Sequence, residues 1–274
     1  MPVGNSATFR RVSGILERGD SALYHEVAGS GRPVLFIHAG VTDSRMWDGQ
    51  FRAIEGWQLI RFDMRGYGKS RLGSERFINR DDALDLLDYL GIDSAVIVGC
   101  SIGGNTALQI AATAPERIDG LVLVATDAPG FDPEIEYESP EWPDAVAAFT
   151  AGDLQRAAEL EAEIWLAGIG RTCSELPRET VDLFVEMDLI ALNNETARND
   201  LDIEEPLTEL PELDAPVEVI IGARDIPQMA ASAVHLATEL GNGDPVVIED
   251  TAHLPPMDQP LVFNTVLERF LSGL

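Results

Sequence analysis

The sequence predicts an α/β fold, with a mostly parallel eight-stranded sheet flanked by helices and a helical insertion. Two observations lead to this fold class. Short apolar runs rich in β-branched residues alternate with segments of helical periodicity along most of the 274 residues, as in βαβ units. Several runs, among them VLFIH, AVIVG, LVLVAT and VEVII, are apolar throughout. Strands of that kind are covered on both faces, which is typical of a parallel sheet between helices.

The first two predicted strands differ from the others because they mix polar and apolar residues. They are Arg11–Arg18 and Ala22–Val27, joined through the turn sequence RGDS, and this pattern suits an antiparallel hairpin at the sheet edge. Six strands follow, namely Pro33–His38, Gln58–Asp63, Ala95–Gly99, Gly120–Thr126, Val217–Ile221 and Pro245–Glu249. Helical spacing predicts helices over Asn79–Leu90, Gly103–Ala114, Ala230–Leu240 and Leu261–Leu274.

Residues 131–212 contain no strand-like run and are expected to form the helical insertion. In GDLQRAAELEAEIWLAG, Asp153 is placed to cap the start of a helix and Gly168 to end it. In LPRETVDLFVEMDLIALNN, Pro177 stands where the first helical position is expected, and apolar residues recur at helical spacing. The insertion is therefore predicted to contain at least these two helices.

The chain is strongly acidic, with 19 Lys and Arg against 47 Asp and Glu and a formal net charge of −28. Because phosphate binding requires a basic surface, nucleic acid is excluded as a partner. Residues 131–212 alone carry 22 acidic and 4 basic residues, a net charge of −18. Such a concentration is typical of a solvated surface, and adaptation to high salt or repulsion of anionic substrates is the alternative interpretation.

Other general features predict a cytoplasmic protein without a membrane partner. No apolar run reaches the roughly 18 residues that a membrane span requires, and the N-terminal MPVGNSATFRRVSG lacks the apolar centre of a secretory signal. The two cysteines, Cys100 and Cys173, fit neither zinc spacing nor a disulfide framework. We therefore expect free thiols and no metal site, and a homo-oligomer remains compatible with the sequence.

The segment VGCSIGG places Ser101 between a predicted buried strand and a predicted helix. Gly99 and Gly103 remove the Cβ atoms that would clash at a sharp turn there. Such a turn exposes the serine at the carboxyl edge of the sheet as a nucleophile elbow, and the positive end of the helix faces it. The alternative interpretation is a serine that only caps the helix.

Further motifs follow other predicted strands. PVLFIHAG ends in His38, Ala39 and Gly40, and QLIRFDMRGYGKS continues into a glycine-rich turn. The GKS within that turn is not a phosphate loop, because the first glycine of GxxxxGK[ST] would fall at Asp63. Asp225 ends the late strand segment VEVIIGARD, and His253 follows the last strand in TAHLPPMDQP.

The order Ser, Asp, His and the motifs around it resemble the α/β-hydrolase fold superfamily along nearly the whole chain. Within this superfamily, the sequence looks most similar to microbial carboxylesterases and 3-oxoadipate enol-lactonases. This resemblance rests on the motifs VTDSRMW and HLPPMDQP and on the small size of the cap. The resemblance implies a hydrolase core domain over residues 1–130 and 213–274 and a helical cap, or lid, over residues 131–212. A serine at the elbow argues against haloalkane dehalogenases and epoxide hydrolases, which have aspartate there.

Within this resemblance, the candidate catalytic residues are Ser101, Asp225 and His253. An aliphatic hydroxyl needs a base within hydrogen-bond reach, and the unperturbed pKa of histidine suits that task, so His253 is the candidate base. Asp225 would hold the imidazole in the correct tautomer. Asp127, which ends LVLVATD, is the alternative acid, because some α/β-hydrolases take the acid from that earlier strand.

The resemblance also implies an oxyanion hole formed by the backbone N–H groups of Gly40 and Ile102. His38 is expected to support the loop that carries Gly40 rather than to take part in catalysis. The candidate substrate-pocket residues are Met46, Trp47 and Trp165, each of which has packing as its alternative role.

The function implied is that of a serine hydrolase that cleaves a small, mostly apolar carboxylic ester through an acyl-enzyme, without metal or cofactor. Hydrolysis of a lactone or enol-lactone, hydrolysis of a carbon–carbon bond and cofactor-free perhydrolysis use the same groups and stay open. Fold analogy does not separate these reactions. The alternative of another class is a non-catalytic ligand-binding or signalling protein on the same fold.

Overall fold

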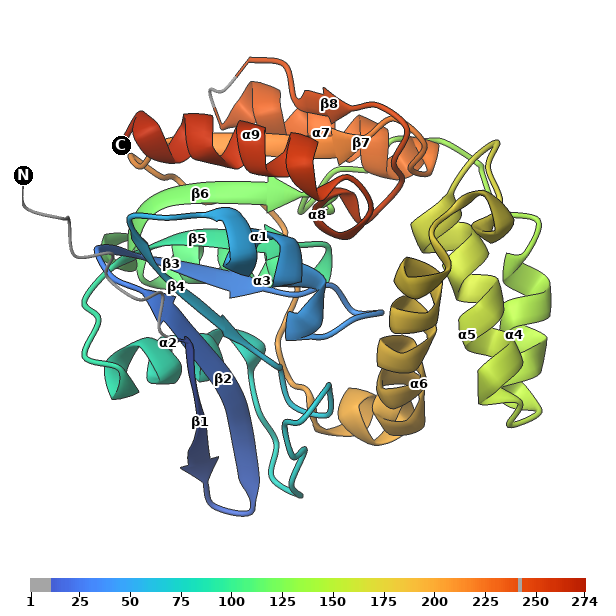
Figure 1. Ribbon diagram of the computed structural model, residues 1–274, viewed down its shortest axis with the longest axis horizontal. Helices are drawn as coiled ribbons and strands as arrows, with labels where there is room; N and C mark the ends of the chain where they lie inside the picture. Colours follow the sequence, from blue (N-terminus) through green and yellow to red (C-terminus); the bar gives the residue numbers. More distant parts are fainter. Residues whose placement is uncertain (1–10, 241–242) are drawn as a thin grey trace, which may run out of the picture.

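The computed structural model describes residues 11–240 and 243–274. The first ten residues of the predicted core segment 1–130 lie outside the described residues. They include most of the N-terminal segment on which the prediction of a cytoplasmic protein rests. Eight strands form one sheet in the order β1-β2-β4-β3-β5-β6-β7-β8 (Figure 1). The strands are β1 (Arg11–Arg18), β2 (Ser21–Gly29), β3 (Arg32–Ile37), β4 (Trp57–Phe62), β5 (Ala95–Cys100), β6 (Ile118–Val124), β7 (Val217–Gly222) and β8 (Val246–Ile248).

The predicted fold class is confirmed. Strand β2 pairs antiparallel with β1 and β4, and every other neighbouring pair is parallel. The ends of the eight strands differ from the predicted ends by at most two residues. The mixed pattern of the first two strands therefore did mark an edge hairpin, and the wholly apolar runs did mark parallel strands.

Four helices match those predicted outside the insertion, two match those predicted within it, and the remaining helices of the described residues were not predicted. The helices are α1 (Asp48–Ala53), α2 (Asn79–Tyr89), α3 (Ile102–Thr113), α4 (Trp142–Thr150), α5 (Leu154–Glu161), α6 (Arg178–Leu201), α7 (Pro227–Glu239), α8 (Pro255–Asp258) and α9 (Pro260–Ser272). Shorter turns are Ser44–Trp47, Pro115–Arg117, the π-helical turn Ala162–Ala167 and Cys173–Glu175. Among the helices described, none has the length and apolarity needed to span a membrane.

Two details of the second helix predicted in the insertion differ between the sequence-based prediction and the structure. Pro177 is the residue before helix α6 rather than its first helical position. The helix continues to Leu201, seven residues beyond the end of the predicted segment, because ETARNDL contains neither glycine nor proline to stop it. Asp153 caps α5 as expected, with its side chain accepting a hydrogen bond from the N–H of Arg156.

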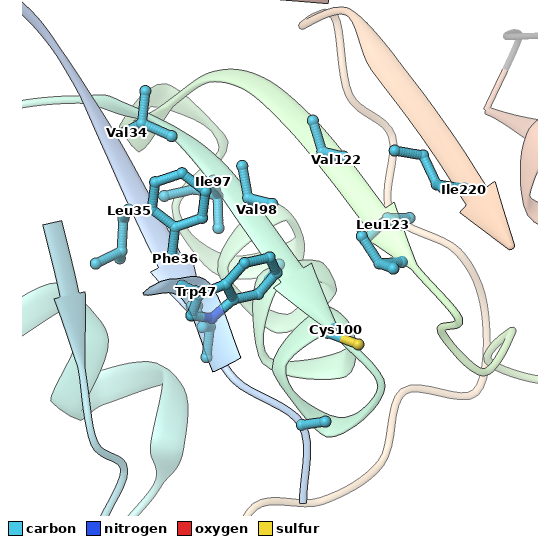
Figure 2. Close-up of a cluster of buried hydrophobic side chains, with 14 of the residues drawn as sticks. Val34, Leu35, Phe36, Trp47, Ile97, Val98, Cys100, Val122, Leu123 and Ile220 are labelled. Carbon is cyan, nitrogen blue, oxygen red and sulfur yellow. The ribbon is translucent and has the colours of Figure 1, made fainter. Parts of the chain in front are cut away.

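The centre of the sheet is apolar on both faces, which is why its strands read as continuous hydrophobic runs. Leu35, Phe36, Val98 and Leu123 are fully buried, and Figure 2 shows them on adjacent strands. The ring of Trp47 packs against Phe36, with centroids 5.1 Å apart. Burying an aliphatic or aromatic side chain of this size stabilises the folded state by roughly 1.5–3 kcal/mol.

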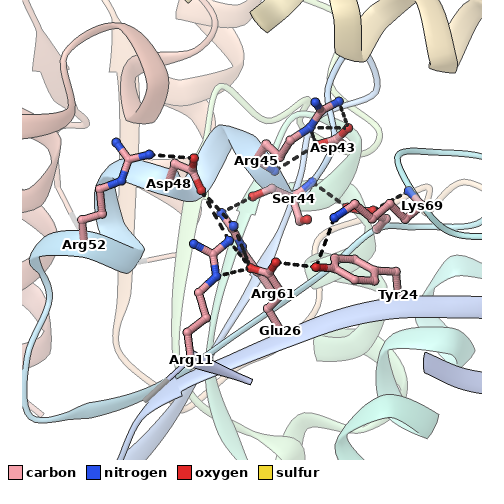
Figure 3. A network of polar contacts seen from close by, with 11 residues as sticks. Arg11, Tyr24, Glu26, Asp43, Ser44, Arg45, Asp48, Arg52, Arg61 and Lys69 are labelled. Atoms are coloured by element: carbon pink, nitrogen blue, oxygen red, sulfur yellow. Dashed lines mark hydrogen bonds and ion pairs between the residues drawn. The ribbon is translucent and has the colours of Figure 1, made fainter. Parts of the chain in front are cut away.

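A buried arginine connects the edge of the sheet to the loop after β3. Arg61 on β4 is 1% exposed, and its guanidinium lies 2.7 Å from Glu26 and 2.8 Å from Asp48 (Figure 3). It also donates a 2.8 Å hydrogen bond to the carbonyl of Ser44 and stacks over Phe51. Because a buried charge is tolerated only when it is paired, these contacts hold the loop after β3 in one position.

Helices α4, α5 and α6 stand together beside the sheet, and the arrowheads of β3 and β6 point toward them (Figure 1). Helix α5 packs against both α4 and α6. This group is joined to the loops after β7 and β8, because the N–H of Ile169 donates to the carbonyl of Arg224 and the N–H of His253 donates to that of Trp165. The insertion therefore meets the sheet where parallel strands end.

Candidate active site

Ser101 lies at a sharp turn between β5 and α3, with φ 54° and ψ −119°. The turn depends on its glycines: a Cβ on Gly99 would lie 2.2 Å from the carbonyl oxygen of Gly103, and a Cβ on Gly103 would lie 2.4 Å from that of Ile37. Ser101 occupies the position before the helix, but its side chain makes no capping hydrogen bond. The geometry therefore favours the nucleophile elbow over the capping serine.

His253 and Asp225 lie side by side after the last two strands. Nδ1 of His253 and Oδ2 of Asp225 are 2.9 Å apart, and both side chains are almost fully buried. Because the carboxylate can only accept, Nδ1 carries the proton of this hydrogen bond and Nε2 is left to accept one. Cys100 also contacts the loop that carries His253, because its thiol donates a hydrogen bond to the backbone carbonyl of His253 at 3.6 Å. Cys100 therefore has a packing role.

Ser101 and His253 line the same cavity of about 430 Å³. No hydrogen bond joins the Ser101 hydroxyl to the imidazole within residues 11–240 and 243–274. In a ligand-free active site such contacts are commonly long and tighten when substrate binds.

The alternative acid, Asp127, lies on the loop after β6 and also lines the cavity. Its Oδ1 accepts a 3.2 Å hydrogen bond from the hydroxyl of Ser232, and no contact with His253 is present in the described part of the chain. Of the two acids that the sequence left open, Asp225 is the one that touches the imidazole.

Gly40 and Ile102 lie next to each other in the cavity wall. A Cβ on Gly40 would lie 3.5 Å from Cγ2 of Ile102, and both residues line the cavity wall. Neither N–H donates to an acceptor among the residues that the structure describes. Ile102 also begins α3, so the partial positive charge of that helix adds to its N–H. Two unused donors beside a candidate nucleophile are the arrangement that an oxyanion hole requires.

His38 lies behind this wall and does not line the cavity. Its Nδ1 donates to the carbonyl of Ala39 at 2.8 Å, and its Nε2 accepts from the N–H of Met64 at 3.0 Å. Burial lowers the pKa of His38 to about 4, so the ring is neutral near pH 7. These contacts connect the loop that carries Gly40 to the turn after β4, which is a supporting role.

The expectation that Met46 and Trp47 line a substrate pocket is wrong. They are 1% and 0% exposed and belong to the apolar core rather than the cavity. The sulfur of Met46 accepts hydrogen bonds from Ala39 and Thr42, so it fastens the loop internally. Trp165 does line the cavity, with its ring centroid 4.8 Å from that of His253. It belongs to the π-helical turn, a feature frequently found at functional sites.

The far wall of the cavity holds acidic residues that were not singled out from the sequence. Asp188 and Glu195 come from α6 and Glu161 from the end of α5. Asp188 is 1% exposed, and its Oδ2 is buried without a hydrogen-bond partner. Burial, reinforced by the neighbouring carboxylates, raises the pKa of Asp188 to about 9 and that of Glu161 to about 7.

Asp188 is expected to make the stability of the protein depend on pH. Its pKa rises from 3.8 to about 9 on folding, so between these values the folded state retains a proton that the unfolded state loses. The free energy of unfolding therefore falls as pH rises through this window. Asp188→Asn removes this pH-dependent loss of stability. We compare the melting temperature of the variant minus that of the wild type at the two pH values. This difference should be larger at pH 8 than at pH 5 by at least about 3 °C.

The matched control for this measurement is Asp200→Asn, an exposed acid on the same helix. It should shift the melting temperature equally at both pH values. A constant difference between Asp188→Asn and the wild type across pH 5 to pH 8 would contradict a neutral, buried Asp188.

Comparison with known proteins extends these observations. Residues 32–260 match the family model described as the alpha/beta hydrolase fold. An uncharacterised protein of Mycobacterium bovis is 28% identical over 265 residues, which cover 90% of this chain and 77% of that protein.

Two solved structures cover nearly the whole chain. A thermophilic esterase from Thermogutta terrifontis superposes with a TM-score of 0.74 at 25% identity, covering 96% of this chain and 98% of that one. The enol-lactonase from Burkholderia xenovorans superposes with a TM-score of 0.75 at 23% identity, covering 94% and 100%. At these identities the common property is the fold.

Proposed function

Because this chain belongs to the α/β-hydrolase fold family, we propose that it is a serine hydrolase that cleaves a small carboxylic ester through an acyl-enzyme intermediate. The observation that carries the proposal is the 2.9 Å hydrogen bond between Asp225 and His253 in a cavity that Ser101 also lines. The strained turn at Ser101 and the two unused N–H donors beside it support the same chemistry.

In the first half-reaction, Ser101 Oγ attacks the ester carbonyl carbon while Nε2 of His253 takes the hydroxyl proton. The N–H groups of Gly40 and Ile102 stabilise the oxyanion of the tetrahedral intermediate. When the intermediate collapses, the bond to the alcohol oxygen breaks and His253 returns the proton to the leaving alkoxide. Asp225 stabilises the imidazolium without taking its proton.

In the second half-reaction, water replaces the alcohol. His253 takes a proton from the water as its oxygen attacks the acyl carbon, and the same two N–H groups hold the oxyanion. Collapse releases the carboxylic acid, and His253 returns the proton to Ser101.

The cavity limits the size of the substrate. Its volume of about 430 Å³ lies at the lower end of the range for small-molecule sites. Val41, Trp142, Trp165 and Met229 supply an apolar part of its wall. We propose that residues 131–212 act as the cap domain; Trp142 and Trp165, which belong to this segment and line the same cavity as Ser101, support this proposal.

Covalent labelling with a fluorophosphonate tests the proposal. We expect the reagent to modify the wild type at Ser101, identified by mass spectrometry of the modified peptide, because an activated serine beside an oxyanion hole attacks phosphorus as it attacks an ester carbonyl. Ser101→Ala should remain unlabelled, and Ser174→Ala, at an exposed serine, should label like the wild type. An unlabelled wild type would contradict the proposed function.

A further inference from the structure

The cavity that Ser101 lines holds more carboxyl groups than cationic groups. Glu161, Asp188 and Glu195 line the cavity together with one cationic side chain, Arg198. None of the three carboxylates forms an ion pair within 4.0 Å in the described part of the chain. Asp188 is the least exposed of them; it lines a cavity large enough for a ligand, and its buried Oδ2 has no hydrogen-bond partner in the described part of the chain.

The helical spacing explains why these groups converge. Asp188, Glu195 and Arg198 stand at i, i+7 and i+10 on α6, so they lie on one face of that helix. Glu161 faces them from the end of α5, which packs against α6. The acidic cluster of Glu161, Asp188 and Glu195 is therefore built by two helices of the insertion.

Arg198 is already engaged by other groups. Its Nη1 donates to the carbonyl of Ala191 at 3.1 Å, and its guanidinium stacks over the ring of Tyr67 at 4.1 Å. It is 8% exposed, and its charge lowers the pKa of Asp188 but does not cancel the effect of burial and of the neighbouring carboxylates. The cavity wall therefore has three carboxyl groups and a single guanidinium, which already contacts Ala191 and Tyr67. Hydrogen-bond acceptors are in excess over donors among these four side chains.

We propose that the acidic cluster binds a protonated alkylamine group carried by the substrate, so that the preferred ester is cationic. The inference rests on the proposed ester hydrolysis and adds the charge of its substrate. An ammonium N–H would give Asp188 Oδ2 the hydrogen bond that it lacks, and charge-assisted bonds of this kind are strong in a desolvated site. The aromatic faces of Trp142 and Trp165, also in the cavity wall, favour the alkyl groups and charge of such a ligand.

Binding of a cation should release protons. Asp188 and Glu161 have raised pKa values of about 9 and about 7, so Asp188 is neutral at neutral pH before a cation binds. The groups that face Asp188 are Glu161 from α5, Glu195 and Arg198 from α6, and Tyr67 from the turn after β4. His253 and Asp127 lie elsewhere in the same cavity wall. A bound ammonium favours the carboxylate and therefore lowers the pKa of Asp188.

Matched pairs of esters test the inference. The first pair carries the charge in the alcohol, 2-(dimethylamino)ethyl acetate against 3-methylbutyl acetate. The second carries it in the acyl group, ethyl 4-(dimethylamino)butanoate against ethyl 5-methylhexanoate. In each pair a protonated nitrogen replaces a CH of the same shape. We expect kcat/KM to favour the cationic ester by about tenfold or more in one pair, the size of a charge-assisted hydrogen bond.

Substitutions locate the effect. Asp188→Asn and, separately, Glu161→Gln should lower the cationic-to-neutral ratio of kcat/KM about fivefold or more, whereas Asp200→Asn should leave it unchanged. Because the ratio is taken within one protein, it is insensitive to partial misfolding. A wild type that prefers the neutral ester in both pairs, or a ratio that neither Asp188→Asn nor Glu161→Gln changes, would overturn the inference.

Calorimetric titration with trimethylammonium chloride, which keeps one N–H donor, separates this inference from the proposed function. With Ser101→Ala, binding at pH 7 should release protons, so its enthalpy should differ between phosphate and HEPES buffers in proportion to their ionisation enthalpies. An enthalpy that does not depend on the buffer, or no binding, would count against the cation site. Absence of fluorophosphonate labelling together with absence of turnover of all four esters would count against ester hydrolysis instead.

Discussion

Replacing Ser101 by alanine is expected to lower kcat for a p-nitrophenyl ester by about 10⁶-fold, because the nucleophile and its base act as a unit. Ser101→Gly should be equally inactive but more stable than the wild type. At φ 54° and ψ −119° a residue with a Cβ stores about 1–3 kcal/mol of backbone strain, and glycine relieves it. The greater entropy of glycine in the unfolded chain offsets about 0.5–1 kcal/mol. The net gain should be about 1 kcal/mol, within a range of about 0–2.5 kcal/mol, measured by urea denaturation.

Ser101→Ala is the matched control for stability, because it loses the hydroxyl but keeps the Cβ. It should unfold at the same urea concentration as the wild type to within a small difference. Equal stability of the Gly and Ala variants would limit the strain at the turn to the roughly 0.5–1 kcal/mol that the entropy of glycine offsets. Retention of more than about 1% of kcat in either variant would place the nucleophile elsewhere.

The sheet was the most predictable part of the molecule because its signal is local. Runs such as AVIVG are apolar throughout since both faces of β5 are covered, and Ala95–Cys100 is buried at every position. The edge hairpin was predictable for the opposite reason, since β1 keeps one face in solvent. The short helix α1 was not predicted, because six residues are too few to show helical periodicity.

The candidate site was predictable only where a residue type and a turn occur together. Ser101, Asp225 and His253 each follow a strand that the sequence marks, and parallel strands end at the same edge of a sheet. Met46 and Trp47 were misplaced because a loop residue gives no indication of whether it faces a pocket or the core. Trp47 packs against Phe36 and Phe263, and the sulfur of Met46 accepts hydrogen bonds from Ala39 and Thr42.

The acidic cluster could not have been predicted, because its three residues belong to a segment in which acidic side chains are common. Residues 131–212 carry 22 acidic side chains, and most of such residues lie on a solvated surface. Asp188 is distinguished only by the packing of α6 over the cavity, which leaves it 1% exposed. A buried carboxylate without a partner destabilises the fold. The same property lets it select a charged ligand, so the predicted gain in stability of Asp188→Asn and its predicted loss of selectivity have one physical cause.

Asp225→Asn is expected to lower kcat by about 10⁴-fold with little change in KM. Asp225 Oδ2 accepts the proton-bearing Nδ1 of His253 at 2.9 Å, and this hydrogen bond leaves Nε2 free to accept the proton of Ser101. An asparagine can offer its amide N–H to Nδ1 instead, which places the imidazole proton on Nε2 and removes the base. It also takes away the charge that stabilises the imidazolium.

Asp127→Asn is the matched control, since Asp127 lines the same cavity but bonds to Ser232 rather than to His253. We expect its kcat to stay within about tenfold of the wild type, because no charge that faces the imidazolium is lost. Comparing the two variants on one p-nitrophenyl ester decides between the acids. If Asp127→Asn alone lost several orders of magnitude in kcat, the acid would come from the loop after β6, and the hydrogen bond between Asp225 and His253 would be structural. The present geometry predicts the reverse, because only Asp225 can hold the tautomer in which His253 acts as a base.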